Sequence, residues 1–172
     1  RGINVIETNV IQFPYSKFEY NVTGEGCKHN QDLMYIDVHD FCDTKVNGRY
    51  DLYGDYTNNS AVNVHHIGTN STSRIDVKSI VDDNSHSSFL GCITVDKNAI
   101  DTDAELVNKN LLVSNTATTI TEPQLDIHTK EIACSHGCTV SNIDENQLYF
   151  LQSRGIETNM AEETLKQCFL TE

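Results

Sequence analysis

Three side chains that bind soft metal ions alternate in a short segment near the C-terminus. Cys134, His136 and Cys138 are separated by the small residues Ser135 and Gly137. Alternate residues of an extended strand face the same side, so the three side chains would share one face if a strand reaches that far. Thiolate and neutral imidazole are ligands for iron, zinc or an iron–sulfur cluster. The segment is therefore a candidate metal site, with Cys134, His136 and Cys138 as possible ligands.

The same residue types also have a purely structural interpretation. Free cysteines are usually small buried hydrophobes, and a histidine between them can simply hydrogen-bond a turn. A complete mononuclear site needs a fourth ligand, and none follows nearby in the sequence. A second subunit could complete a shared site, so both interpretations stay open at this level.

Two further pairs of polar residues carry weaker signals. Asp101 and Asp103 could be the paired carboxylates of a glycosidase, or could bind Ca²⁺ as in a polysaccharide lyase, although aspartates in turns are usually solvated corners. His65 and His66 are adjacent, so in a strand they face opposite sides and cannot form a joint metal site. We expect one of them to point inward and the other into solvent.

Composition restricts the range of functions. The chain has 172 residues, which suits a single domain, and its net charge is −13, from 12 Lys and Arg against 25 Asp and Glu. This charge argues against binding to nucleic acid or to an anionic membrane surface, because both need clustered cations. No apolar run approaches the roughly 20 residues that span a bilayer. The sequence therefore predicts a soluble protein without a nucleic-acid or membrane partner.

The elements that would position the metal ligands are short strands. From about residue 22 to 134, Val, Ile and Thr alternate with polar residues, and clusters of Asn, Asp, Ser and Gly separate the runs. This pattern is typical of half-buried strands joined by tight turns, as in a sandwich, a barrel or a parallel β-helix. Apolar residues also recur at a rough spacing of 16 to 18, at Ile75, Ile93, Leu111 and Ile127. Abundant Asn, which can form ladders at the corners of stacked coils, favours the β-helix.

After Thr139 the pattern becomes helical. Asp144 followed by Gln147 resembles a capping box, and Gly155 suits a left-handed stop, which predicts a helix near 145–154. Thr158 could cap a second helix. Five residues of that helix share one face at helical spacing: Met160, Ala161, Leu165, Cys168 and Phe169.

We therefore divide the chain into a β-helix, residues 1–140, and a C-terminal helical segment, residues 141–172. The helical segment can close the open end of the strand domain and can also present a surface to a partner. The predicted partner-binding residues are Leu148, Phe150, Leu151, Arg154, Leu165 and Phe169.

Five motifs, in this order and spacing, resemble the C-terminal part of the SufB/SufD family, the scaffold subunits of the SUF iron–sulfur cluster assembly machine. They lie at residues 99–104 (Ala-x-x-Thr-Asp-Ala), 110–114, 122–127, 133–137 (Ala-Cys-Ser-His-Gly) and 149–156. The Cys-Ser-His-Gly sequence is more similar to the SufD branch than to the SufB branch, which carries Glu-His-Glu there. The resemblance runs from about residue 20 to the end. Family members are much longer, so we expect this chain to be an N-terminally truncated portion.

The resemblance implies a right-handed parallel β-helix that pairs with a SufB-like subunit and a helical segment that docks the SufC ATPase. It also implies that His136 matches the family histidine at the subunit interface, where it and a cysteine of SufB are thought to build the nascent cluster. The chain departs from the family at Lys130-Glu131, where paired acids are frequent, at Glu105, where glutamine is usual, and at Cys138, where alanine is common.

The sequence therefore predicts a non-catalytic scaffold subunit, in the cytoplasm or, in a eukaryote, in the plastid stroma. Its partners would be a SufB-like subunit and a SufC-like ATPase. We expect a transient iron or iron–sulfur cluster at the subunit interface and no cofactor tightly bound to the isolated chain. The alternatives are a carbohydrate-active β-helix enzyme that uses Asp101 and Asp103, and a structural β-helix that self-associates as a homodimer.

Overall fold

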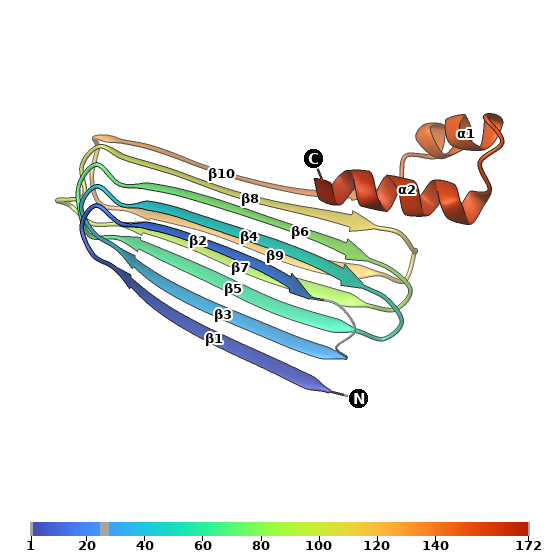
Figure 1. Cartoon of the computed structure of the whole chain (residues 1–172), viewed down its shortest axis with the longest axis horizontal. Helices are drawn as coiled ribbons and strands as arrows, with labels where there is room; N and C mark the ends of the chain where they lie inside the picture. The colour runs from blue at the N-terminus through green and yellow to red at the C-terminus, as the bar shows by residue number, and fades with distance from the viewer. Residues whose placement is uncertain (1, 25–27, 172) are drawn as a thin grey trace.

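A computed structural model describes residues 2–24 and 28–171. The described part contains ten strands followed by two helices (Figure 1). The strands are β1 (Ile3–Gln12), β2 (Lys17–Gly24), β3 (His29–Val38), β4 (Asp43–Leu52), β5 (Thr57–His66), β6 (Thr72–Val81), β7 (His86–Val95), β8 (Thr102–Leu112), β9 (Thr118–Ile127) and β10 (Ile132–Asn142); the helices are α1 (Glu145–Ser153) and α2 (Thr158–Thr171).

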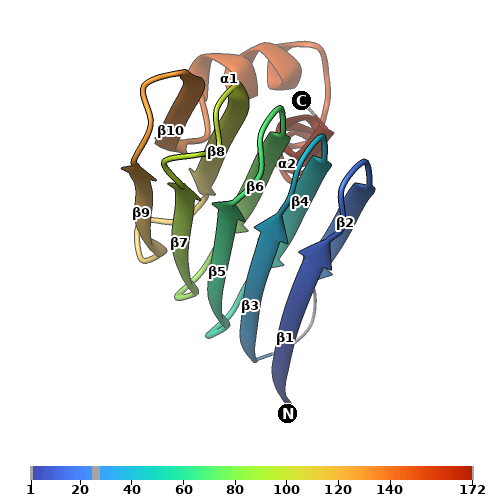
Figure 2. The same cartoon turned by 90° about the vertical axis from the view of Figure 1, so that its left-hand side faces the viewer.

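The strands form two parallel sheets that face each other. One sheet has the order β1-β3-β5-β7-β9 and the other the order β10-β8-β6-β4-β2. The chain alternates between the sheets, so each turn of the coil consists of two strands. Figures 1 and 2 show a right-handed coil whose axis runs from β1 and β2 to β9 and β10. This confirms the predicted β-helix with a small helical segment after it.

Period-two alternation places one set of side chains inside the coil. On β5, for example, every second residue from Asn58 to His66 is buried. The parallel register then stacks inward-facing residues of successive turns into columns, such as Val46, Ile75 and Leu106 in β4, β6 and β8. All three of these side chains are buried. The core is therefore a set of aliphatic columns that run along the axis of the coil.

The true repeat is longer than the spacing visible in the sequence. Thr57 pairs with His86, and Ile75 pairs with Leu106, which are separations of 29 and 31 residues. The spacing of 16 to 18 residues joins consecutive strands of opposite sheets and so corresponds to half a turn. No sequence motif repeats with the full turn, which explains why the sequence showed only the shorter interval.

An asparagine ladder lies inside the coil at the start of β1, β3 and β5. Asn4 Nδ2 donates to Asn30 Oδ1 at 2.7 Å, and Asn30 Nδ2 donates to Asn58 Oδ1 at 2.7 Å. Such amide ladders satisfy polar groups between stacked coils. Ladders of this kind were expected from the asparagine content, although this one lies within the strands rather than at a corner.

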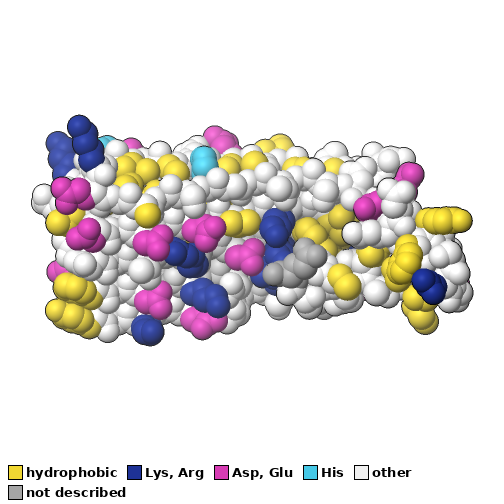
Figure 3. Space-filling model, turned by 90° about the horizontal axis from the view of Figure 1, so that it is seen from above, with side chains coloured by type: hydrophobic (Ala, Val, Ile, Leu, Met, Phe, Trp, Pro, Cys, Tyr) yellow, Lys and Arg dark blue, Asp and Glu magenta, His cyan; other side chains and the backbone are white. Residues whose placement is uncertain are grey.

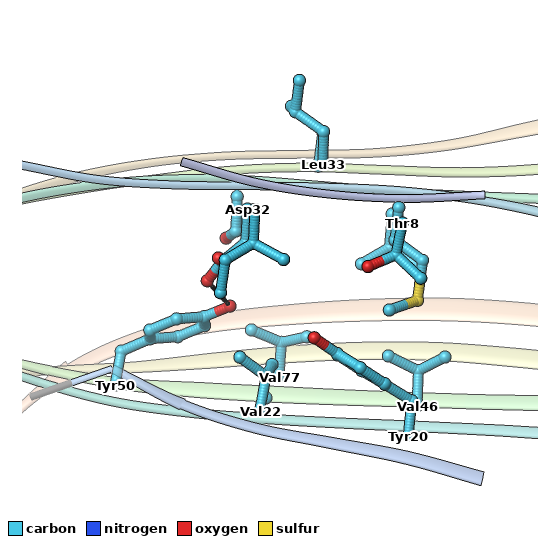
Figure 4. A pocket seen from close by; sticks show the side chains of 14 residues that line it. Thr8, Tyr20, Val22, Asp32, Leu33, Val46, Tyr50 and Val77 are labelled. Atoms are coloured by element: carbon cyan, nitrogen blue, oxygen red, sulfur yellow. Dashed lines mark hydrogen bonds between the residues drawn. The ribbon is translucent and has the colours of Figure 1, made fainter. Parts of the chain in front are cut away.

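A second interior polar group is the Asp32–Tyr50 pair between the first turns (Figure 4). Asp32 points from β3 into a small cavity, whereas its neighbour Leu33 points outward. Tyr50 Oη donates to Asp32 Oδ2 at 2.9 Å. Burial raises the pKa of Tyr50, and the charge of Asp32 raises it further, so Tyr50 stays a neutral donor.

Gly68 marks a tight contact between two turns. A Cβ atom at this position would overlap the backbone nitrogen of Asp40, and backbone atoms cannot move aside as a flexible side chain can. We therefore expect Gly68→Ala to lower the free energy of unfolding by about 2 kcal/mol or more, measured by urea denaturation. Gly137→Ala is the matched control, because a Cβ there meets no atom within 4 Å. Equal urea midpoints for the two variants would contradict this expectation.

Both helices begin and end close to the predicted positions. Asp144 caps α1, with its Oδ1 accepting a hydrogen bond from the Asn146 backbone N–H at 2.8 Å, and Gly155 follows α1 with a φ of +88°. Thr158 is the first residue of α2 rather than a residue before it, and its hydroxyl accepts a hydrogen bond from Gln152 Nε2 at 3.0 Å. On the expected apolar face, Ala161 is buried but Met160 is 63% exposed.

Cations on the outer face of the β10–β2 sheet hold the C-terminal end of α2. Lys78 Nζ donates to the Phe169 carbonyl oxygen at 3.0 Å, and Arg49 Nε donates to the Leu170 carbonyl oxygen at 3.2 Å. The last carbonyls of a helix lack intrahelical partners and carry partial negative charge, so two cations stabilise this end. The helical segment is thereby fixed to the side of the coil, over the sheet whose outer face carries mixed charges in Figure 3.

Candidate metal centre at the open end of the coil

The segment with the candidate ligands is β10, the last strand of its sheet. β10 pairs with β8 on one side, and β9 ends the opposite sheet in the same way. In the described part of the chain no further strand pairs with either of them. The last turn therefore leaves one edge of each sheet open, at the end of the coil opposite to β1 and β2 (Figure 2).

The register shows which way the candidate ligands face. On β10, Cys134 pairs with Ala104 and His136 pairs with Leu106, while Cys138 pairs with a third β8 residue, Asn108. All three β8 partners are buried inside the coil. β10 continues to Asn142, so the strand extends through the whole segment. The three soft ligands thus share the interior face of the last turn, as their alternation predicted.

These interior-facing residues are nevertheless accessible. His136 ends the aliphatic column of Val46, Ile75 and Leu106, but it is exposed, and Cys138 is exposed as well. Cys134 is half-buried and packs against the hydrophobic core. In earlier turns the equivalent positions are covered by the next turn. In the described residues no further turn covers the last one. The imidazole of His136 and the thiol of Cys138 are therefore exposed at the end of the core.

The surroundings of Cys134 disfavour its thiolate. Burial raises the pKa of Cys134, a backbone hydrogen bond at Ala104 partly offsets this, and the nearby charge of Asp103 raises the pKa further. The thiolate is the form that binds metal. Metal binding at Cys134 must therefore overcome the cost of ionising a half-buried sulfur.

Within the described residues, no three His, Cys, Asp or Glu side chains lie close enough to hold a metal ion together. The open end of the coil can still supply fewer ligands than a complete site. A thiolate and an imidazole from this chain suit borderline metals such as iron, with the remaining positions left to another molecule. The donor set therefore fits a shared site rather than a closed one.

The two aspartates of the alternative carboxylate pair take part in structural contacts. Asp103 Oδ2 accepts a hydrogen bond from an Arg74 Nη atom at 2.6 Å, and Asp101 occupies a corner with a φ of +53°. The backbone N–H of Asp101 donates to the Glu131 carbonyl oxygen at 2.8 Å, which joins this corner to the following turn. Both aspartates therefore have evident structural roles.

The two adjacent histidines face opposite sides, as expected. His66 is fully buried, with Nδ1 2.7 Å from Ser71 Oγ and Nε2 2.9 Å from Ser73 Oγ. Burial lowers the pKa of His66 to about 4, and the neighbouring His65 adds to this shift. His65 lies on the outer face, with Nε2 3.1 Å from Asp96 Oδ1. The two rings share no site.

Three of the predicted partner-binding residues line one groove between α1 and α2. These are Phe150, Leu151 and Leu165. Phe150 is 56% exposed, and the Arg154 guanidinium lies 5.2 Å from its ring centroid. Leu148 is half-buried on the same helix. The helical pair therefore presents an apolar groove beside one cation.

The sixth residue, Phe169, faces the body of the coil instead. Lys78 Nζ lies 5.7 Å from the centroid of its ring, in addition to the hydrogen bond to its carbonyl oxygen. The sequence did not indicate that Lys78 or Arg49 would contact the helical segment. No local signal could have shown this, because these residues lie 91 and 121 positions before their acceptors.

Comparison with known proteins shows the family of the chain. A family model described as "SUF system FeS cluster assembly, SufBD core domain" matches residues 3–169. The chain belongs to this family. The SufBD core thus comprises both the coil and the helical segment, including the strand with the three soft ligands.

Three of the relatives come from two bacteria and a plant. The chain is 41% identical over 95 residues to the iron–sulfur cluster assembly protein SufD of Escherichia coli, covering 55% of this chain and 22% of that protein. It is 35% identical over 95 residues to a SufBD family protein of Synechocystis, covering 55% and 21%, and 35% identical over 84 residues to the chloroplastic protein ABCI7 of Arabidopsis thaliana, covering 49% and 18%. The matched regions span about a fifth of these relatives. In the described residues, neither helix has the length and apolar content needed to cross a bilayer.

Proposed function

We propose that the protein is a non-catalytic scaffold subunit of the SUF machine that pairs, through the open end of its coil, with a SufB-like subunit. The observation that carries this proposal is the uncovered interior layer of the last turn, which ends in His136. A partner that stacks on this layer would bury apolar surface and would bring its own ligands to the imidazole.

The composition of β10 supports pairing at this edge. Strands at the edge of a sheet are usually protected by charged side chains, proline or bulges, because their free N–H and C=O groups can recruit another strand. β10 contains no Asp, Glu, Lys, Arg or Pro. β9, in contrast, contains Pro123, which cannot donate a hydrogen bond to a ladder. We therefore expect β10 to carry most of the strand pairing with the partner.

Iron or a nascent cluster would be bound at this interface between the open end of the coil and the SufB-like subunit, and would be passed on from there. The imidazole of His136 would ligate iron, with a cysteine sulfur beside it and further ligands from the partner. Because the described residues bring no three ligands together, we expect the isolated chain to release the cargo readily and to retain no tightly bound cofactor. The bacterial and chloroplastic relatives favour a location in the cytoplasm or the plastid stroma.

The groove between α1 and α2 would dock a SufC-like ATPase. An apolar groove beside a cation suits an amphipathic surface of a partner. Because α2 is held to the coil by Lys78 and Arg49, movement of a bound ATPase would be transmitted to the body of the scaffold. The chain itself would perform no chemical step.

Co-purification tests the pairing. The full chain is mixed with purified SufB-like and SufC-like proteins and analysed by size-exclusion chromatography. We expect a complex that contains all three proteins. A homodimer of this chain that excludes the SufB-like protein would identify a self-associating coil, and a monomer that binds neither protein would overturn the proposal.

The helical groove has its own test. We expect Phe150→Ala to weaken binding of the SufC-like ATPase about tenfold, measured by calorimetry, because it removes an exposed aromatic anchor from the groove. Tyr149→Ala is the matched control, since Tyr149 is 72% exposed and lies outside the groove. Equal affinities of the two variants would place the ATPase elsewhere.

A further inference from the structure

We propose that Cys138, rather than Cys134, is the thiol of this chain that binds a borderline divalent metal ion together with His136. The assignment of iron as the natural metal rests on the proposed function. The pairing of these two side chains rests on the structure of β10 alone.

Strand geometry limits which of the three side chains can act together. Alternate residues of a strand lie about 6.6 Å apart, and side chains on the same face can lean together to reach one ion. Cys134 and Cys138 lie about 13 Å apart along the strand, which is too far for two cysteine side chains with metal–sulfur bonds of about 2.3 Å. One ion can therefore join His136 to one of the two thiols, but not to both.

Burial distinguishes the two thiols. Cys134 is half-buried, packs against the hydrophobic core and stacks on the methyl group of Ala104. Turning its sulfur toward an ion beside His136 would withdraw it from that packing. Cys138 is exposed, so its side chain can turn toward an ion without opening the core.

The layer beneath Cys138 is polar. Cys138 stacks on Asn108, whose Oδ1 accepts a hydrogen bond from Asn110 Nδ2 at 2.6 Å, and both asparagines are buried. The layer beneath His136 is Leu106, and the layer beneath Cys134 is Ala104. The buried amides make the Cys138 end of the strand the less apolar place for a charged thiolate.

Two ligands from one strand leave the rest of a tetrahedral site to water or to a second chain. This agrees with the lack of a third His, Cys, Asp or Glu close enough to share the ion in the described residues. A metal held in this way is exposed to a partner at the end of the coil. It can therefore be transferred or built upon without opening the fold.

Cobalt(II) titration of the full, reduced chain tests the pairing without any partner. A cysteine ligand gives thiolate-to-cobalt charge-transfer absorption, which an imidazole or a carboxylate does not give. We expect Cys138→Ser to abolish this absorption and His136→Ala to weaken cobalt binding at least about tenfold. Cys134→Ser and Cys168→Ser should keep the absorption; Cys168 is another exposed cysteine and controls for binding at an unrelated thiol.

Two results would overturn the pairing. One is charge-transfer absorption that is lost with Cys134→Ser but kept with Cys138→Ser. The other is a wild-type chain whose cobalt absorption is unchanged by both substitutions. Either result would contradict the metal pairing but would still allow the three-protein complex to assemble. Conversely, if that complex failed to form, the cobalt titration of the isolated chain would still test the metal pairing. The two proposals can therefore fail separately.

Discussion

His136→Ala is expected to slow iron–sulfur cluster formation by the reconstituted three-protein complex at least about tenfold. The imidazole ends an interior column at the open end of the coil and is exposed, so its removal creates no cavity in the core. Stability and complex formation should therefore stay close to those of the wild type. Cluster formation is measured by visible absorption and by transfer to an apo-acceptor protein.

His128→Ala is the control for this substitution. His128 is another exposed histidine, but it follows β9 rather than lying on β10, and its Nε2 lies 3.2 Å from Asp126 Oδ1. We expect it to assemble clusters at the wild-type rate. If an intact complex with His136→Ala formed clusters as fast as the wild type, the imidazole would have no part in cluster assembly.

Acid should destabilise the coil through His66. The folded state holds the pKa of His66 at about 4, below the ordinary value of 6.5, because the ring is buried between two serine hydroxyls. As the pH falls from 6.5 to 4, the unfolded chain binds a proton that the folded chain does not bind. The free energy of unfolding should therefore drop by about 3 kcal/mol over this range, with no further loss from this group below pH 4.

Urea denaturation at several pH values measures this effect. The variant His66→Gln cannot titrate, so it should lose this component of the pH dependence although it is less stable at neutral pH. His65→Gln is the matched control, because His65 lies on the outer face and its removal leaves the buried ring in place. A wild-type pH dependence in His66→Gln would show that other groups cause the acid sensitivity.

The proposed role of His136 depends on its position at the open end of the coil. Polar side chains deeper in the coil can bond to one another, as in the ladder of Asn4, Asn30 and Asn58. His136 instead stands over Leu106, with nothing stacked on its other side in the described residues. A ring in this position can bind a ligand from outside without losing a partner inside the coil.

Local sequence patterns predicted the strands from about residue 22 onward and both helices, but not β1 and most of β2. The alternation of Val, Ile and Thr specifies strands, because one face of each strand must be buried, and the turn residues between them limit strand length. Asp144 and Gly155 mark the ends of α1 through interactions with groups a few residues away. The spacing of Cys134, His136 and Cys138 placed all three on one face as soon as the segment was taken as a strand.

Only the tertiary structure decided which face of β10 points inward. Its other face carries Ala133, Ser135 and Gly137, which are no more polar than the ligands, so hydrophobicity alone does not choose between the two faces. The choice follows from the register with β8, about 30 residues earlier, and no repeated motif marks that distance. The contacts of Lys78 and Arg49 with α2, and the complete burial of His66, likewise depend on residues brought together by stacking of the turns. A strand pattern is a local property, whereas register and burial are set by packing between distant segments.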